Sequence, residues 1–230
     1  MQPETPMMAQ GRSTSIALAQ NRVLRNTYLL LALTMVPTII GALVGIATAP
    51  VIMAHPIAIS LAVFFGVIGL QFAIAANRNN AIGIALLLLM TGILGWYLGP
   101  ILNFALAMKN GAALVGYAAG GTGAILFGMG AIAATSKRDF GFLGKFLYVG
   151  MWALVLAMFA NMFLQIPALA LALSTLVIVV FSLFLLFDLQ RIMRGGETNY
   201  IMATTAVYMS LFNIFVNLLN ILMALTGNRN

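Results

Sequence analysis

The chain has 230 residues, of which 63% are hydrophobic, while Lys, Arg, Asp and Glu together make up only 7%. A soluble globular domain of this length has more surface than so few charged side chains can cover, so that class of protein is excluded. The composition indicates an integral membrane protein. The chain contains no cysteine and therefore forms neither disulfides nor thiolate sites.

The membrane spans are expected within stretches that contain no Asp, Glu, Lys or Arg. These stretches cover residues 26–77, 79–108, 110–136, 146–187 and 198–228. A spanning helix needs about 20 apolar residues, so the first and fourth stretches each hold two helices and the others one. Turn-forming residues place the predicted helices at 27–47, 57–76, 81–98, 112–134, 143–164, 169–192 and 201–225. The predicted fold class is an all-α integral membrane protein, a seven-transmembrane-helix bundle.

The N-terminal segment 1–21 is polar and lacks the basic start and apolar middle of a secretory signal. We predict a flexible tail over 1–21 and a transmembrane domain over 22–230. One side of the predicted membrane receives most cations, namely Arg12, Arg22, Arg25, Arg78, Lys137, Arg138, Lys145, Arg191 and Arg194. The other side receives Lys109 and Arg229. By the positive-inside rule, the N-terminus is cytoplasmic and the C-terminus lies across the membrane.

The formal net charge of +7 follows from this bias. It favours attraction to anionic lipid over nucleic-acid binding, for which the chain has neither a basic domain nor a motif.

The predicted fourth helix carries small residues at every fourth position. They are Gly116, Gly120, Ala124 and Gly128. Small residues let two helix backbones approach closely, so this stripe predicts a packing site for another helix. A phosphate-binding loop at 120–123 would need a preceding strand and a following lysine, and neither is present.

Catalytic chemistry has few candidate residues. His55 is the only histidine, and the only aspartates are Asp139 and Asp188. A histidine-rich zinc site, a Ser-His pair within one chain and a pair of intramembrane aspartates are therefore excluded. We predict a protein that is not an enzyme, with no catalytic residues, no metal site and no cofactor.

Asp188 is the one charged residue inside an apolar stretch, and such an acid is expected to face the bundle interior or a water-filled cavity. Arg191 lies three residues further on the same helical face, which predicts a structural ion pair at the membrane boundary. The alternative is a proton- or cation-responsive site. Burial and the neighbouring arginine act on the carboxyl's protonation in opposite directions, so the sequence leaves both interpretations open.

The last predicted helix has a polar seam. Its members are Ser210, Asn213, Asn217 and Asn220. Such a seam is expected to face protein and not lipid. It predicts either hydrogen bonds between helices or the lining of a narrow hydrated path beside Asp188, and the first interpretation is favoured.

Three segments together are similar to the Bax inhibitor-1 (transmembrane BAX inhibitor motif) family. They are Leu186-Phe187-Asp188-Leu189, the stretch from Gly195 through Glu197 to Ile201, and Val207 to Asn213 in the last helix. The resemblance implies the seven-helix fold. Its bacterial branch further implies an inner-membrane protein that binds and inhibits the ATP-dependent membrane protease FtsH, alone or with its regulatory membrane complex.

Other members of that family are pH-sensitive calcium leak channels that use two aspartates on the last two helices. Asp188 matches the first of these, but Ser210 stands at the second position and cannot ionise. The basic partner expected within the second helix is also missing, because Arg78 lies at its end. A calcium site needs several oxygen ligands whose negative charge compensates that of the ion, so calcium binding is doubtful. The FtsH modulator is therefore the expected function, and a cation leak centred on Asp188 is the alternative.

Overall fold

The computed structural model describes the backbone of residues 6–227 and the side chains of residues 20–227. Its helices are α1 Pro6–Ala47, α2 Ala49–Ala54, α3 Pro56–Ala76, α4 Ala81–Tyr97, α5 Gly99–Ala107, α6 Gly111–Thr135, α7 Leu143–Leu164, α8 Pro167–Met193 and α9 Tyr200–Gly227. Residues 6–227 contain no strand. Seven helical stretches are long and apolar enough to cross a membrane, so the predicted fold class is confirmed.

Most helix ends lie close to their predicted positions because turn residues mark them. Pro56 and Pro167 each occupy the first turn of a helix, where the missing backbone N–H leaves no hydrogen bond unmade. Asn80 caps α4 by accepting a hydrogen bond from the Gly83 amide. The third span, however, does not end at Leu98. It continues as α5 to Ala107, because Pro100 lies in the first turn of α5 and starts a helix there instead of stopping one.

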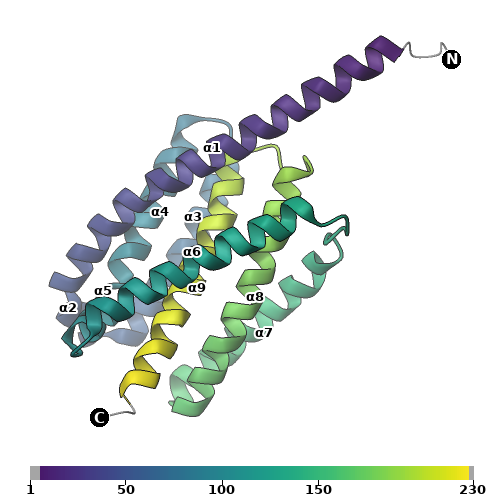
Figure 1. The fold of residues 1–230 in the computed structure, drawn as a ribbon. Coiled ribbons are helices and arrows are strands. Elements are labelled where there is room, and N and C mark those ends of the chain that lie inside the picture. Colours follow the sequence, from purple (N-terminus) through teal and green to yellow (C-terminus); the bar gives the residue numbers. More distant parts are fainter. Residues whose placement is uncertain (1–5, 228–230) are drawn as a thin grey trace.

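Helix α1 also begins far ahead of its predicted start. It starts at Pro6, so the helix passes through most of the predicted tail 1–21. No proline lies between Pro6 and Pro37, and the helix continues through Pro37 to Ala47. Figure 1 shows this N-terminal part extending away from the rest of the bundle. The flexibility of the tail stays a prediction, and residues 1–5 lie outside the described residues.

Helix α9 is the central element of the bundle and contacts α1, α3, α4, α5, α6 and α8. In Figure 1 it passes among these helices, whereas α7 lies at the periphery against α8. The main hydrophobic core gathers around the buried Val207, Tyr208 and Ile214 of α9. Polar side chains on α9 therefore face protein over much of their surface, as the seam predicted.

Close helix packing occurs between α1 and the α4–α5 span. A Cβ added at Gly41 would overlap the carbonyl oxygen of Gly92, and one added at Gly45 would overlap that of Trp96. The two backbones touch here because both sides carry glycine.

The small-residue stripe of α6 has no such contact among the described residues. A Cβ at Gly116, Gly120 or Gly128 would meet nothing within 4 Å, and Ala124 is also exposed. The opposite face of α6, which carries Leu114 and Ala118, is the buried one. The close approach predicted for this stripe is thus found between α1 and α4, and the stripe itself faces outward.

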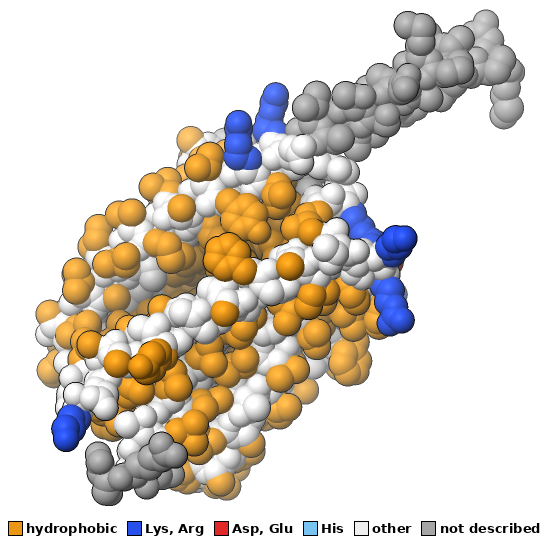
Figure 2. Space-filling model, viewed as in Figure 1, with side chains coloured by type: hydrophobic (Ala, Val, Ile, Leu, Met, Phe, Trp, Pro, Cys, Tyr) orange, Lys and Arg blue, Asp and Glu red, His pale blue; other side chains and the backbone are white. Residues whose placement is uncertain are grey.

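The outer surface of the bundle is apolar, and charged side chains lie at its ends. Figure 2 shows hydrophobic side chains over the length of the helices, with Lys and Arg gathered mainly at the end from which α1 extends. Large side chains such as Phe65, Phe127 and Phe163 are more than 60% exposed. A soluble protein would not tolerate so much apolar surface, whereas a bilayer requires it.

Candidate functional site

Asp188 lies on α8 near the basic end and is partly buried. It lines a cleft of about 20 Å³ between α8 and α9, enough for a single water molecule. The other lining residues are Arg191, Ile192, Glu197, Met202, Ala203 and Ala206.

Arg191 does not form the predicted ion pair with Asp188. Its guanidinium is paired instead with the carboxylate of Glu197, and its Nε donates to the carbonyl oxygen of Gly196 at 3.4 Å. Among the side chains of residues 20–227, no Lys or Arg nitrogen lies within 4.0 Å of the Asp188 carboxylate. The carboxyl therefore faces the cleft without a direct cationic partner from those residues.

The backbone after α8 explains this choice of partner. Gly195 has a φ of 76°, a left-handed conformation that favours glycine. The amide of Gly195 donates to the carbonyl of Ile192 at 3.2 Å, and that of Gly196 to the carbonyl of Arg191 at 2.8 Å. These two bonds form a Schellman motif, which folds the chain back over the last turn of α8. Glu197 is thereby brought beside Arg191.

The polar seam of α9 lies further from the basic end than the cleft. Ser210 and Asn217 are 2% and 4% exposed, and Asn213 and Asn220 are partly buried. The Asn213 side chain donates to the carbonyl of Met209, and that of Asn217 to the carbonyl of Asn213. These two amides are satisfied within α9, so the predicted hydrogen bonds between helices are not made by them. Ser210 follows Ala206 by one turn and does not line the cleft.

Hydrogen bonds between helices come instead from residues that the sequence reasoning did not single out. The hydroxyl of Tyr208 shares a hydrogen bond of 2.8 Å with Thr38 of α1, and the hydroxyl of Thr204 donates to the carbonyl of Thr27 at 3.3 Å. Tyr208 is 2% exposed. A tyrosine within an apolar helix is itself a signal, because its buried hydroxyl needs a partner.

The segment after α8 also connects the loops at the basic end. Asn199 accepts hydrogen bonds from the amides of Ile201 and Met202, which caps α9. Its side-chain nitrogen donates to the carbonyl of Arg78 at 2.8 Å and to Asn79 at 3.0 Å. One side chain therefore joins the start of α9 to the turn between α3 and α4.

Gln190 joins the end of α8 to the loop between α6 and α7. It is 2% exposed, accepts a hydrogen bond from the amide of Phe140 and donates one to the carbonyl of Arg138, both at 2.8 Å. The sequence reasoning did not identify Gln190. The available signal was an amide in the last turn of an apolar helix, where it would need buried partners.

The family model described as Inhibitor of apoptosis-promoting Bax1 matches residues 20–228. The chain belongs to this family. The resemblance carried by the segments around Asp188, Glu197 and Tyr208 is thereby confirmed, and the match takes in every described span.

Two relatives cover almost the whole chain. The chain is 42% identical over 216 residues to the Escherichia coli K12 protein named Modulator of FtsH protease YccA, which covers 94% of this chain and 96% of the relative. It is 39% identical over 225 residues to an uncharacterized membrane protein of Vibrio cholerae, and this match covers 97% of the chain and 99% of the relative. The family, the relatives and the seven apolar helices together identify a multi-pass membrane protein.

For this member of the family, metal-binding groups are few. The described residues contain no cluster of three or more His, Asp or Glu side chains able to hold a metal ion. Glu197 is the other carboxylate that lines the Asp188 cleft, and it is paired with Arg191. The donor set beside Asp188 is thus poor for calcium.

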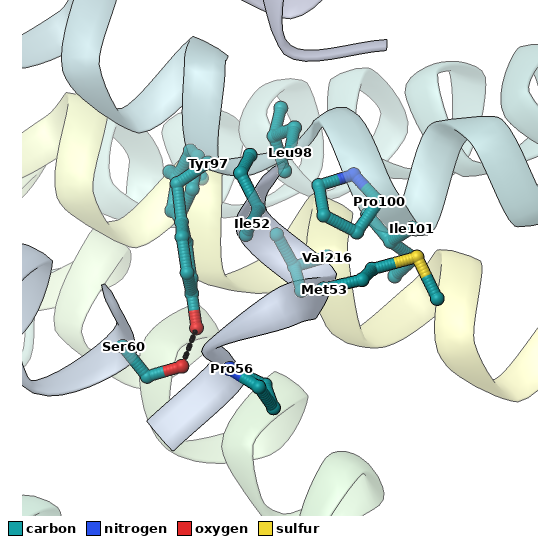
Figure 3. A pocket seen from close by; sticks show the side chains of 10 residues that line it. Ile52, Met53, Pro56, Ser60, Tyr97, Leu98, Pro100, Ile101 and Val216 are labelled. Atoms are coloured by element: carbon teal, nitrogen blue, oxygen red, sulfur yellow. Dashed lines mark hydrogen bonds between the residues drawn. The ribbon is translucent and has the colours of Figure 1, made fainter. Parts of the chain in front are cut away.

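A larger cleft opens at the opposite end of the bundle, among α2, α3, α5 and α9 (Figure 3). Its volume is about 290 Å³, and its lining side chains are uncharged. The hydroxyls of Tyr97 and Ser60 bond to each other at 2.7 Å across one side of it. Because these two hydroxyls partner each other, the cleft offers apolar surface and no reactive group.

Proposed function

We propose that this protein is a non-enzymatic inner-membrane regulator that binds the membrane protease FtsH and slows its action on other membrane substrates. The observation that carries the proposal is the 42% identity to a protein named Modulator of FtsH protease YccA, over 94% of this chain. A protein from another Escherichia coli strain with the same match is named Inner membrane protein YccA, which supports the location.

The fold supports a mechanism in which the protein occupies the protease. A protease that threads its substrates must first engage a segment outside the membrane and then extract the helices. Helix α1 extends from the bundle at the basic end, and that end is predicted to be cytoplasmic (Figure 1). The central α9, held to α1 through Tyr208 and Thr204, resists extraction. We infer a slowly processed client that keeps the protease from other substrates.

Affinity purification from mild detergent tests the proposal. The full-length protein is expected to retain FtsH in a fixed ratio, and its overproduction is expected to lengthen the lifetime of a known membrane client of FtsH. A Lys109→Gln variant, changed at the opposite end of the bundle, serves as the control and should retain the protease equally. Failure to retain FtsH, with the client degraded at its usual rate, would contradict the proposal.

A weak cation leak centred on Asp188 is the second candidate. The pairing of Arg191 with Glu197 favours it, because the Asp188 carboxyl is left facing the cleft. The small volume of that cleft and the serine at 210 count against rapid conduction. In liposomes, Asp188→Asn should remove any pH-dependent ion movement, and Ser210→Asp should increase calcium flux. If the unaltered protein moves neither protons nor calcium, the leak hypothesis is wrong.

A further inference from the structure

A patch of exposed cations and aromatic rings lies where α6 is joined to α7. It consists of Lys137, Arg138, Phe142, Lys145 and Phe146, all exposed, and we call it the basic-aromatic patch. Both phenylalanines are 73% exposed. Figure 2 shows Lys and Arg side chains gathered at this corner of the molecule. Lys137, Arg138 and Lys145 belong to the cations that set the predicted orientation, but the proposed binding to FtsH gives none of these five side chains a contact of its own.

The backbone that carries the patch is held in place from α8. Gln190 bonds to the amide of Phe140 and to the carbonyl of Arg138. Arg194 donates to the carbonyls of Ser136 and Arg138 at 3.2 and 2.8 Å. The cations of the patch are thus presented on a fixed loop, which lowers the entropy that a ligand would have to overcome.

The acid nearest the patch does not cancel its charge. Asp139 pairs with Arg194, with 3.6 Å between its Oδ1 and the Arg194 Nη1. Within residues 20–227, none of the three cations of the patch forms an ion pair, so they can meet an external anion, and a phosphate group has the complementary charge.

The aromatic rings of the patch and the exposed apolar face of α7 indicate which kind of anion would bind. Lys145, Val149, Trp152 and Leu156 recur at helical spacing on one face, and the three apolar members are 71%, 53% and 68% exposed. A soluble polyanion would gain nothing from this apolar continuation, whereas a lipid has a phosphate for the cations and acyl chains for the helix. We propose that the basic-aromatic patch binds the headgroup of an anionic phospholipid, with the acyl chains along α7.

Trp152 provides an internal reporter. It lies seven residues beyond Lys145, about 10 Å along the same face of α7. A full-length Trp96→Phe protein leaves it as the only tryptophan. This protein is reconstituted into vesicles of phosphatidylcholine with a minor fraction of phosphatidylglycerol. In one preparation the acyl chains of phosphatidylcholine are brominated, and in the other those of phosphatidylglycerol. Both preparations contain the same total amount of bromine. Quenching should be stronger with brominated phosphatidylglycerol, by at least the local enrichment of about five-fold that a single one of the three cations would give.

Matched variants decide whether the patch causes the enrichment. The triple variant Lys137→Gln, Arg138→Gln, Lys145→Gln should lose it, while Lys109→Gln at the other end of the bundle and the charge-preserving Lys137→Arg, Lys145→Arg should keep it. If the triple variant fails to fold, salt gives the test, because high ionic strength should abolish the enrichment around the unaltered patch.

Equal quenching by the two brominated lipids would overturn the proposal, as would enrichment that survives the triple substitution or high salt. The vesicles contain no other protein. A triple variant that loses FtsH in affinity purification, with no lipid preference in the unaltered protein, would assign the patch to a protein partner and would also overturn the proposal.

Discussion

The side-chain amide of Asn199, just ahead of α9, donates a hydrogen bond of 2.8 Å to the backbone carbonyl of Arg78, in the turn between α3 and α4. The same side chain caps α9 through the amides of Ile201 and Met202. The central helix of the bundle is therefore tied at its first turn to a distant loop. This contact gives a structural role to the stretch 195–201, one of the three segments that carry the family resemblance.

Replacing Asn199 by alanine should destabilise the protein. Loss of a helix cap costs about 1 kcal/mol, and loss of the bonds to the α3–α4 turn adds about 1 kcal/mol. The free energy of unfolding in detergent should thus fall by about 2 kcal/mol. Asn103→Ala is the matched control, because its exposed side chain makes only a 3.4 Å bond to the Ile46 carbonyl. If both variants unfold alike, the Asn199 contacts do not stabilise the bundle.

Glycines on two helices should respond oppositely to the same substitution. Gly45→Ala places a methyl group against the Trp96 carbonyl, and overpacking of this kind costs about 1–3 kcal/mol. Gly116→Ala meets nothing within 4 Å and gains up to about 1 kcal/mol in helix propensity. Thermal unfolding of both variants in the same detergent measures the contrast. A marked loss of stability in Gly116→Ala would indicate that the α6 stripe packs against protein after all.

The spans were predictable because each depends on a local quantity, the length of an apolar run between turn residues. Pro56 and Pro167 mark helix starts in the sequence as they do in the structure. Pro100 does not reveal its role, because a proline ends one helix or begins the next according to the backbone around it. Without an alternation of polar and apolar faces, α6 gave no sign of which side is buried within the chain, and packing of its glycine stripe against another helix stays a prediction.

The surroundings of Asp188 were only partly predictable. Its place in an apolar stretch indicated a protein-facing acid, and the structure places it at a cleft between α8 and α9. The spacing to Arg191 suggested an ion pair, because helical neighbours three residues apart share a face. The left-handed turn at Gly195 decides otherwise by bringing Glu197 to Arg191. The spacing of residues along a helix cannot predict an ion-pair partner that is brought into place by the conformation of a loop.

Reporter fusions test the orientation in the membrane. A reporter fused after Asn230 should be exported, and one fused after Arg138 should stay in the cytoplasm, because Lys and Arg cluster on one side of the seven spans. Alkaline phosphatase is active only after export and green fluorescent protein only inside, so the pair gives opposite readouts at each site. A C-terminal fusion active only inside the cell would contradict both the orientation and the odd number of spans.

Removing residues 2–20 tests how the protease engages this protein. The deletion removes Arg12 but keeps Arg22 and Arg25, so most of the cations that set the predicted orientation remain. By the predicted topology, this segment is the longest stretch of the given sequence on the cytoplasmic side. The shortened protein is expected to persist several-fold longer in cells and, if the helices bind FtsH, to inhibit it more strongly.

A version with residues 2–20 shuffled controls for length and composition. It should be degraded like the original chain if the protease needs only a segment of that length to pull, and it should persist if a particular sequence is recognised. Pulse-chase labelling gives the lifetimes, and the survival of a known FtsH client gives the inhibition. Should the shortened protein disappear as fast as the full-length one, the tail is not what the protease engages. The contact must then lie on the bundle, where the exposed face of α7 and the outward stripe of α6 are two candidate surfaces.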